Sequence, residues 1–386
     1  MLALGIDLGT TNTVVATSAQ ALPLLEGDHE ALHLPSAVAF LPGGGALVGH
    51  AASARRPIDP INTLYSAKRL MGESWTSHAA RTFSQHYPHS LAAGPLGDVQ
   101  FVTRAGAISP GQVASLLVTH ACARAQLDPR TLRAVVAVPS SFRARARLAT
   151  TEALKHVGIP DVRLIEEPVA TAVAYLHRAS LRYAAVYDLG GGTFDFAVVD
   201  CSSSPFRVLG HGGDPYLGGD DVDHALAKLV AERVLRHSGW DLRSDPVTFA
   251  KLAFEIEKAK RELSRTTEVA LSITDVDPAA PPSLAPLVIG RDMLASAVRP
   301  FVQRTFVICD EVLGQIGLRA RDIQAVFLAG GSTRLPLLPN LLADYFRRKV
   351  RSDLHPEHVV AVGASIAAAR PELWPLLGAR GEDCTL

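Results

Sequence analysis

The sequence predicts an α/β protein built from two related lobes, and three observations carry that prediction. A short motif, Asp-Leu-Gly, follows an apolar run near the start of the chain and again about halfway along, at Asp7 and Asp188. Strand-like runs and helix-like spacings of apolar residues follow one another along the chain. The chain has 386 residues, a length that exceeds what a single hydrophobic core usually supports, and 48% of these residues are hydrophobic. The repeated motif therefore indicates a duplicated lobe.

The first copy of the motif is predicted to join two strands. Residues 2–6 lead into it, residues 14–16 lead out, and the turn between them is rich in Gly and Thr. Glycine has no Cβ and adopts positive φ, so successive backbone N–H groups at such a turn can converge on an anion. Asp7 would be repelled by a bare phosphate, and a hydrated Mg²⁺ that bridges phosphates explains it better.

The second copy has the same setting. Residues 184–186 precede Asp188, and residues 194–199 follow the turn. Two such turns that face each other would form a phosphate clamp with a metal between them. Asp-Leu-Gly is also ordinary turn chemistry, but two copies in equivalent strand-turn-strand settings favour duplication over coincidence.

The remaining elements follow from apolar periodicity and from Gly and Pro. We expect strands at 134–138, 162–165 and 325–329. We expect helices at 111–126, 143–157, 251–264, 294–316 and 356–369, with two more that start at Glu167-Pro168 and after the glycine cluster 212–221. Turns or loops are expected at 42–45 and 276–287.

Four features have both a structural and a functional interpretation. Glu167 stands just before a helix, where the helix dipole favours a carboxylate, and this is its structural interpretation. In its functional interpretation, Glu167 points into a cleft. Gly218 and Gly219 belong to an ordinary loop, or they offer backbone donors to a phosphate at a helix start. The charged face of helix 251–264 is solvated or binds a ligand. The Gly-Gly turn at 330–331 follows a strand, in a layout that lets a ligand approach the backbone closely.

Composition excludes several classes of function. Lys plus Arg and Asp plus Glu number 38 each, so no net charge recruits nucleic acid or an anionic membrane. The four cysteines lack metal-site spacing, and we expect reduced thiols at Cys122, Cys201, Cys309 and Cys384. The sequence shows neither a signal peptide nor an apolar run of about 18 residues. We therefore expect a cytoplasmic protein.

Taken in order, the motifs resemble the ATPase domain of the 70-kilodalton heat-shock chaperones from Leu4 to about Ala369. The motifs that carry the resemblance are Asp7–Asn12, the Lys68 segment, Val138-Pro139, Glu167-Pro168, Asp188–Asp195, Leu217–Gly219, Glu257–Ser264 and Gly330–Arg334. The resemblance implies an actin-like (ribonuclease H-like) duplicated two-lobed ATPase fold with a central nucleotide cleft. It places lobe I at 1–180, lobe II at 181–369 and a tail at 370–386.

The resemblance also implies roles for individual residues. Phosphates would be held by Gly9, Thr10, Thr11, Asn12, Gly190, Gly191, Gly192, Thr193, Gly218 and Gly219. The nucleoside would lie against Glu257, Lys260, Arg261, Ser264, Gly330, Gly331 and Ser332, with Arg334 stacked near the purine. Asp7 and Asp188 would hold Mg²⁺ through its waters. Lys68 would place the attacking water, Glu167 and Asp195 would orient water and metal ligands, and Thr193 would contact the γ-phosphate.

Three functions are consistent with these residues. The first is a slow Mg-ATPase that drives a chaperone and uses ATP/ADP, Mg²⁺ and K⁺ as a further cation. The second is a nucleotide-dependent switch with little turnover, and the third is a small-molecule kinase of the same fold. The family implies a J-domain cochaperone and a nucleotide exchange factor as partners. A peptide client is expected only through a domain outside this sequence.

The chain departs from the family pattern in segments linked to interlobe signalling. Pro139 and Arg147 match family positions that transmit the nucleotide state. The usual Asn-Asp after the Phe is replaced by Arg143-Ala144, and the usual Asn-Pro-Asp-Glu before the last helix by residues 355–358, His-Pro-Glu-His. We expect these changes to alter signalling and partner recognition while the phosphate turns stay intact.

Overall fold

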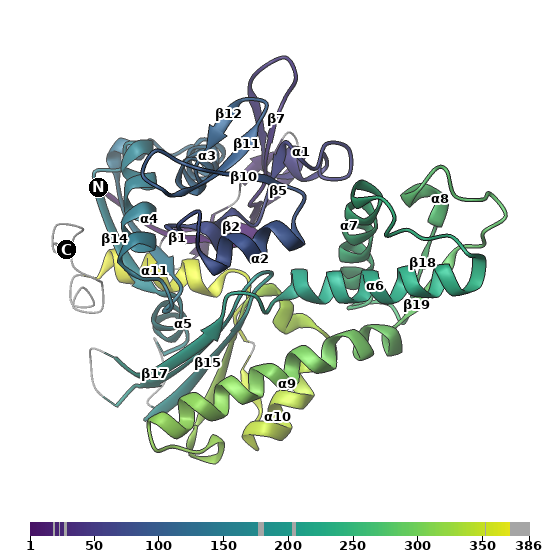
Figure 1. Cartoon of the computed structure of the whole chain (residues 1–386). Coiled ribbons are helices and arrows are strands. Elements are labelled where there is room, and N and C mark those ends of the chain that lie inside the picture. Colours follow the sequence, from purple (N-terminus) through teal and green to yellow (C-terminus); the bar gives the residue numbers. More distant parts are fainter. Residues whose placement is uncertain are drawn as a thin grey trace.

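Two mixed β-sheets with helices packed against them form the body of the protein (Figure 1). The computed structural model describes residues 1–17, 20–22, 24–26, 29–176, 181–202, 206–351 and 353–370. The first sheet has the order β14 (Asp161–Glu166), β13 (Leu132–Val138), β1 (Leu2–Leu8), β2 (Asn12–Thr17) and β3 (Gln20–Ala21). The second has the order β17 (Arg207–Asp214), β16 (Phe194–Asp200), β15 (Tyr183–Leu189), β20 (Ala325–Ala329) and β21 (Val350–Arg351).

Both sheets have the same topology. In each, the opening strand, β1 or β15, pairs antiparallel with the next strand and parallel with a strand from much later in the chain, β13 or β20. The two Asp-Leu-Gly turns therefore occupy equivalent positions, at the end of the opening strand. This confirms the predicted duplication, and we call the parts built on the first and second sheets lobe I and lobe II.

Smaller elements surround the two sheets. In lobe I, β6 (Leu34–Pro35) pairs with β2 and so belongs to the first sheet. The smaller strands of lobe I are β4 (Leu24–Glu26), β5 (His29–Ala31), β7 (Val38–Phe40), β8 (Ala46–Val48), β9 (Thr63–Leu64), β10 (Ser90–Ala93), β11 (Val99–Thr103) and β12 (Gly106–Ile108). Its helices are α1 (His50–Ser53), η1 (Ala67–Leu70), α2 (His78–His86), α3 (Pro110–Arg124), η2 (Pro129–Thr131), α4 (Ala144–Val157) and α5 (Glu167–Leu176). Lobe II adds β18 (Glu268–Leu271) and β19 (Leu287–Gly290). Its helices are α6 (Gly219–Ser238), α7 (Pro246–Glu262), α8 (Ile273–Val276), α9 (Arg291–Gln315), η3 (Ala320–Asp322), η4 (Gly331–Arg334), α10 (Leu338–Phe346) and α11 (Val359–Ala369).

Helices α5 and α11 cross and join the two lobes. Helix α5 follows the first sheet but also packs on β15 and β16, whereas α11, from the end of lobe II, packs on β1 and β13 (Figure 1). A Cβ on Gly363 would lie 1.8 Å from the carbonyl oxygen of Ala170, and one on Gly5 would lie 2.2 Å from that of Ala361. Small residues thus let these backbones touch, and a shared core links the lobes at this crossing.

The glycine cluster at 212–221 is only partly the loop that the sequence suggested. Gly212 and Gly213 lie inside strand β17, and helix α6 begins only at Gly219. A Cβ on Gly212 would lie 2.7 Å from a methyl group of Val312 in helix α9. Gly212 therefore serves the close packing of α9 on the strand, whereas a Cβ on Gly213 would lie 2.4 Å from the Phe194 carbonyl oxygen of the neighbouring strand. Local sequence rules mistake both glycines for turn residues.

Several helices have other limits than predicted, among them α9, which begins at Arg291 rather than Leu294. Helix α7 begins at Pro246 instead of Lys251, because the side chain of Asp245 caps it by accepting a hydrogen bond from the Thr248 amide at 2.8 Å. Helix α11 begins at Val359 rather than Pro356.

Two further expectations concern membranes and cysteines. Across the described part of the chain, none of the helices combines the length and apolarity needed to traverse a bilayer. Cys122, Cys201 and Cys309 are free thiols. Cys384 and the predicted tail beyond residue 370 lie outside the described residues.

Candidate active site

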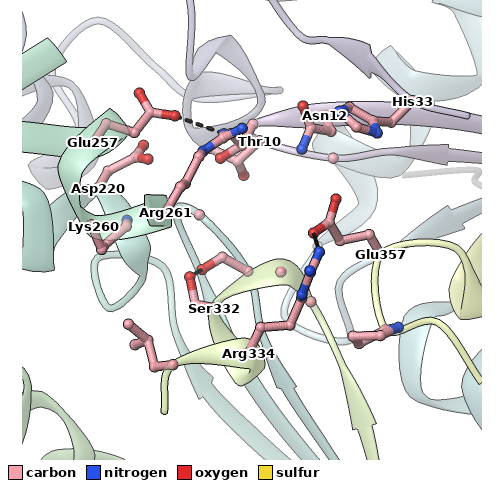
Figure 2. A pocket seen from close by; sticks show the side chains of 18 of the residues that line it. Thr10, Asn12, His33, Asp220, Glu257, Lys260, Arg261, Ser332, Arg334 and Glu357 are labelled. Carbon is pink, nitrogen blue, oxygen red and sulfur yellow. Dashed lines mark hydrogen bonds and ion pairs between the residues drawn. The ribbon is translucent and has the colours of Figure 1, made fainter. Parts of the chain in front are cut away.

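A cavity of about 590 Å³ lies between the lobes, and residues from widely separated segments line it (Figure 2). The predicted site residues that reach it are Asp7, Gly9, Thr10, Thr11, Asn12, Lys68, Glu167, Asp188, Gly190, Gly191, Thr193, Glu257, Lys260, Arg261, Ser264, Gly330, Gly331, Ser332 and Arg334. Asp195, Gly192, Gly218 and Gly219 are not part of its lining. The three glycine turns, η1, the start of α5 and one face of α7 therefore meet at one place.

The first turn is held from behind by Ser36. Its hydroxyl donates to the carbonyl oxygen of Gly9 at 2.7 Å, and its amide donates to that of Thr11 at 2.8 Å. A Cβ on Gly9 would lie 2.3 Å from the carbonyl oxygen of Asn12, so only glycine fits this tight turn.

The second turn faces the first directly. A Cβ on Gly191 would lie 1.6 Å from the hydroxyl oxygen of Thr11, and one on Gly192 would lie 2.4 Å from the Thr10 methyl group. The Thr11 hydroxyl is buried and has no hydrogen-bond partner among the described residues. Because a buried polar group without a partner is costly, this hydroxyl is suited to an anionic ligand held between the turns.

Gly218 and Gly219 do not act as the sequence suggested. The amide of Gly219 donates to the carbonyl oxygen of Gly190 at 3.0 Å, and the amide of Asp220 donates to that of Gly191 at 2.6 Å. These donors are therefore occupied and cannot face a phosphate in this conformation. The segment instead supports the second turn from behind.

Lys68 and Glu167 form an ion pair at the base of the cavity. The ammonium nitrogen of Lys68 lies 2.6 Å from Oε1 of Glu167, and only 9% and 6% of the two side chains are exposed. Burial lowers the pKa of Lys68, but the nearby carboxylates of Glu167 and Asp7 outweigh it and raise that pKa above its ordinary value. Lys68 therefore stays a charged donor. Of the two interpretations of Glu167, the structure supports the one that points it into a cleft.

Three aspartates crowd around this pair. Burial and the Glu167 carboxylate raise the pKa of Asp195 to about 8, and burial raises that of Asp7 to about 7 despite Lys68. The pKa of Asp188 is raised well above its ordinary value, first by burial and then by Glu167. Asp188 and Asp195 are directly opposed on β15 and β16, so both side chains lie on the same face of the sheet. The site thus holds more carboxyl groups than Lys68 can pair with, and without a further cation they retain protons near neutral pH.

This excess of carboxyl groups fits a divalent cation, which would favour their charged form. In the described ranges, no cluster of three or more His, Cys, Asp or Glu side chains is arranged to hold a metal ion directly. Asp7 and Asp188 both line the cavity, where they can accept hydrogen bonds from waters of a hydrated Mg²⁺. The residues present therefore fit a hydrated magnesium ion that accompanies an anionic ligand.

Helix α7 presents its charged face to the cavity because its apolar stripe, which includes Leu252 and Ile256, is buried in lobe II. Glu257 accepts hydrogen bonds from Arg56 of lobe I and from Arg261, each at 2.7 Å. Although burial alone would raise the pKa of Glu257, the arginines lower it to about 2. This face therefore lines the cavity and forms ion pairs there, which favours the ligand-binding interpretation.

Lys260, on the same face of α7, points toward the start of α6. Its ammonium group donates to the Gly219 carbonyl oxygen at 2.9 Å and pairs with Asp223 at 2.7 Å. Lys260 therefore links α7 to the segment that supports the second turn.

The third glycine turn, at Gly330–Ser332, forms the wall of the cavity opposite helix α7. Gly330 has φ of +81°, and a Cβ there would lie 2.3 Å from the Leu189 carbonyl oxygen. The Ser332 hydroxyl donates to the Gly190 carbonyl oxygen at 2.8 Å, which ties this turn to the second. Arg334 pairs with Glu357 at 3.1 Å, and Figure 2 shows Arg334 and Arg261 on two sides of one open space.

Sequence reasoning missed several lining residues. His33, Asp220, Asp223 and Glu357 all reach the cavity. Glu357 lies in the His-Pro-Glu-His segment already noted as unusual, and the two aspartates follow a predicted glycine turn. Each of these three residues therefore lies close to a motif that could have identified it. His33 had none, because it belongs to no motif.

Comparisons with known proteins show which family the chain belongs to. A family model described as Hsp70 protein matches residues 3–370. The chain is 38% identical over 389 residues to "Chaperone protein HscA homolog" from two strains of Acidithiobacillus ferrooxidans, which covers 100% of this chain and 60% of the relative. It is 37% identical over 372 residues to "Chaperone protein HscA" of Edwardsiella ictaluri, which covers 95% of this chain and 58% of the relative.

The chain thus spans about 60% of the length of these curated relatives. The family match covers both lobes and every glycine turn of the cavity. The chain therefore belongs to the Hsp70 family of ATP-hydrolysing chaperones and has the actin-like, two-lobed fold of their nucleotide-binding domain.

Proposed function

We propose that this chain binds ATP with Mg²⁺ in the cavity between the lobes and hydrolyses it slowly, as the nucleotide-driven part of a chaperone. The observation that carries the proposal is the convergence of two facing glycine turns on the Lys68–Glu167 ion pair. Phosphoryl transfer needs little beyond positioning and charge stabilisation, and this arrangement supplies both.

The two turns are proposed to hold the phosphates. Gly9–Asn12 line the cavity from lobe I and Gly190, Gly191 and Thr193 line it from lobe II, and the Thr11 hydroxyl adds a donor that has no other partner in the described structure. Asp7 and Asp188 would hold Mg²⁺ through its waters. When bound, Mg²⁺ supplies charge neutralisation on the phosphate oxygens.

Lys68 is proposed to position the attacking water and to stabilise charge on the γ-phosphoryl group. Glu167 fixes the ammonium group in one orientation by accepting its hydrogen bond at 2.6 Å. Glu167 and Asp195 would orient water and metal ligands by accepting hydrogen bonds, and Thr193 would contact the γ-phosphate.

The nucleoside is proposed to lie between α7 and the third turn. Arg261 and Arg334 have 56% and 47% of their side chains exposed, so both can stack on a base that enters the cavity. Glu257, Lys260 and Ser264 are proposed to hold the ribose and base edges. Gly330–Ser332 would form the floor beneath them.

A nucleotide-dependent switch is the second candidate. Arg56–Glu257 and Arg69–Asp221 are ion pairs between the lobes, so a nucleotide that favours one lobe arrangement would change the surface of the protein. A small-molecule kinase is the distant third.

The domain limits and the partners also stay proposals. We propose that lobe I ends at residue 180 and that lobe II spans 181–369, because α5 and β15 flank this boundary. By relation to the family, we propose a J-domain cochaperone and a nucleotide exchange factor as partners. A peptide client would be bound through the part of the relatives that this chain does not span.

The test uses ATP labelled on its γ-phosphate and the purified chain, with Mg²⁺ or with EDTA, in K⁺ or Na⁺ buffer. We expect tight binding and a slow release of inorganic phosphate that requires Mg²⁺. ATP binding without phosphate release would favour the switch. Phosphorylation of added glycerol or acetate would favour the kinase, and failure to bind ATP would overturn all three.

A further inference from the structure

We infer that Arg69, the residue after Lys68, is a positioning residue that locks the segment carrying Lys68 to the second phosphate turn across the lobe boundary. The inference rests on the proposed ATP hydrolysis and deepens it. It assigns to a side chain outside the cavity lining the task of setting the distance between Lys68 in lobe I and the phosphate-holding turn of lobe II.

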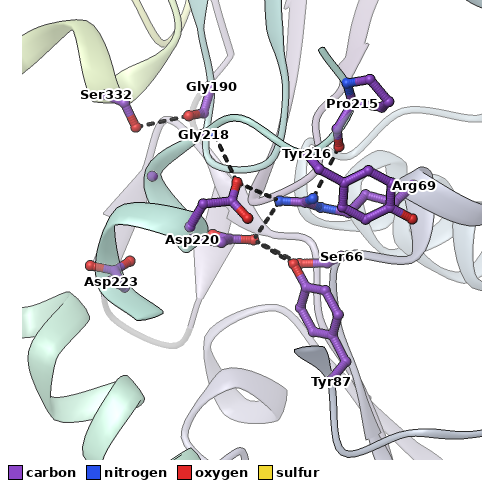
Figure 3. Close-up of polar contacts among 12 residues, drawn as sticks. Ser66, Arg69, Tyr87, Gly190, Pro215, Tyr216, Gly218, Asp220, Asp223 and Ser332 are labelled. Carbon is purple, nitrogen blue, oxygen red and sulfur yellow. Dashed lines mark hydrogen bonds and ion pairs between the residues drawn. The ribbon is translucent and has the colours of Figure 1, made fainter. Parts of the chain in front are cut away.

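Helix η1 directs neighbouring side chains to three different places. Ala67 and Leu70 are buried in the core of lobe I, so the backbone of η1 is anchored there. Lys68 enters the cavity and pairs with Glu167. Arg69 points to lobe II, as Figure 3 shows. Because these side chains share one short turn, movement of Arg69 also moves Lys68.

The guanidinium group of Arg69 is held mainly by lobe II. It donates to the carbonyl oxygen of Pro215 at 3.0 Å and to Oδ2 of Asp221 at 3.3 Å. Its central carbon lies 5.0 Å from the ring centre of Tyr216 and 5.7 Å from that of Tyr87. The side chain has 0% exposure. A charge so fully removed from water depends on these partners, and three of the four would be lost if lobe II moved away from it.

The partners of Arg69 lead directly to the second turn. Asp221 also accepts a hydrogen bond from the amide of Gly218 at 2.8 Å, in the segment whose next amides support the carbonyl groups of that turn. A Cβ on Gly192 would lie 2.9 Å from Nε of Arg69, so the guanidinium packs against the turn itself. Arg69 thus fixes the second turn both by direct contact and through Asp221.

Three further hydrogen bonds cross the lobe boundary beside Arg69. Asp220, which lines the cavity, accepts hydrogen bonds from the hydroxyl groups of Ser66 at 2.9 Å and Tyr87 at 3.2 Å, both in lobe I (Figure 3). The Tyr216 hydroxyl donates to the Ala79 carbonyl oxygen at 2.6 Å. Arg69 is the charged centre of this network, which spans the lobe boundary through hydrogen bonds from both lobes.

Arg69 is therefore expected to affect the rate of ATP hydrolysis although it does not contact the nucleotide. Because Arg69 does not line the cavity, its loss leaves the groups proposed to touch ATP in place. The second turn would then no longer be fixed relative to Lys68, and displacements of about 1 Å in such a site reduce rates up to about 100-fold. Hydrolysis should suffer far more than binding.

The experiment compares Arg69→Ala with wild type and with Arg104→Ala. Arg104 pairs with Asp59 at 2.7 Å within lobe I, so its removal also breaks an arginine ion pair, but away from the lobe boundary. Three quantities are measured: the single-turnover rate at saturating Mg-ATP, the ATP dissociation constant, and hydrogen exchange of peptides covering 190–193 and 214–222 in nucleotide-free protein. For Arg69→Ala we expect a rate at least about tenfold lower, an affinity within about threefold, and faster exchange in both peptides.

The possible results distinguish a failure of the Arg69 inference from a failure of the proposed function. Wild-type exchange in both peptides, or a rate loss matched by an equal loss of affinity, would overturn the inference. If wild type itself releases no phosphate, the proposed function fails, while the exchange measured without nucleotide still tests the Arg69 link. If Arg69→Ala does not fold, Arg69→Lys replaces it. Lysine keeps the charge but cannot bond Pro215 and Asp221 as a fork, so we expect about a threefold or larger rate loss, and a wild-type rate would overturn the inference.

Discussion

The ammonium nitrogen of Lys68 lies 2.6 Å from a carboxylate oxygen of Glu167, although 99 positions separate the two residues in the chain. The pair joins η1, which packs in the lobe I core, to the first residue of α5, the helix that crosses to lobe II. Asp7 and Asp195 act electrostatically on the same ammonium group. The pair thus places one oriented cation among several carboxylates, between the two glycine turns.

Contact between the two turns predicts that Gly191 tolerates no side chain. In Gly191→Ala, the new Cβ would lie 1.6 Å from the Thr11 hydroxyl oxygen, so the turns must separate. We expect ATP affinity to fall at least about tenfold, since misplaced phosphate donors lose their geometry. Gly314→Ala is the matched control, because its Cβ meets nothing within 4 Å and it lies in helix α9. Equal ATP affinity in the two variants would refute the facing-turn arrangement.

The ion pair between Arg56 and Glu257 predicts slower nucleotide release in wild type than in Arg56→Ala. The pair crosses from lobe I to α7 at 2.7 Å, with 20% and 15% of the side chains exposed. Removing one partner of such a pair mainly raises dissociation rates, and we expect ADP to leave about three- to tenfold faster. Stopped-flow release of a fluorescent ADP measures this. In a Glu257→Gln background, Arg56→Ala should change the ADP dissociation rate little. If it speeds ADP release there as much as in wild type, the effect of Arg56 does not depend on Glu257.

The crossing of α5 and α11 predicts a large cost for Gly363→Ala. The added Cβ would lie 1.8 Å from the backbone carbonyl oxygen of Ala170, which a side-chain rotation cannot relieve. We expect the free energy of unfolding to fall by about 1–3 kcal/mol or more, as for overpacked cores. Gly314→Ala should instead be neutral or stabilise by about 0.4–1 kcal/mol. Equal melting temperatures for wild type and Gly363→Ala would contradict the close crossing.

Buried His89 predicts that the protein loses stability in mild acid. Burial lowers its pKa to about 3 in the folded protein, against an ordinary value of about 6.5 for the unfolded chain. Its contribution is complete above the unfolded pKa and declines as pH falls from about 6.5 toward 3, because the unfolded state alone takes up the proton. At pH 5 the loss is about 2 kcal/mol.

His89→Phe isolates this effect. Phenylalanine suits the site, since the ring of His89 lies 4.7 Å from that of Tyr65 and 5.8 Å from that of Phe101. Urea unfolding at pH 7 and pH 5 should show a drop about 2 kcal/mol smaller in the variant than in wild type, because other histidines contribute equally to both. Identical drops would show that His89 does not titrate on unfolding.

The framework of both lobes is predictable from sequence because local rules govern it. Strands β1, β2, β15 and β16 are short apolar runs that end at glycine turns, and the turns repeat. The stripe of α7 predicts which face is buried and therefore which face enters the cleft. Resemblance to the family then supplies Lys68, whose lone position in a short helix carries no local signal.

Long-range packing explains what sequence reasoning misses. Gly212 is needed because α9, about 100 positions later in the chain, packs on its strand, so the local glycine rule misleads. Arg56 and Arg69 resemble solvated arginines in the sequence, yet their partners lie in the other lobe. The amides near Gly219 look available until their acceptors in the second turn are known. The cytoplasmic location stays a prediction.

The most direct test of the account is single-turnover hydrolysis of Mg-ATP by wild type, Lys68→Ala and Lys155→Ala, with ATP affinity measured in parallel. Lys155 is an exposed lysine on helix α4 and controls for the loss of a positive charge. The account predicts that Lys68→Ala binds ATP within about tenfold of wild type but hydrolyses it at least about 100-fold more slowly, while Lys155→Ala matches wild type. Equal hydrolysis rates in wild type and Lys68→Ala, with ATP bound in both, would contradict the central role of the Lys68–Glu167 pair.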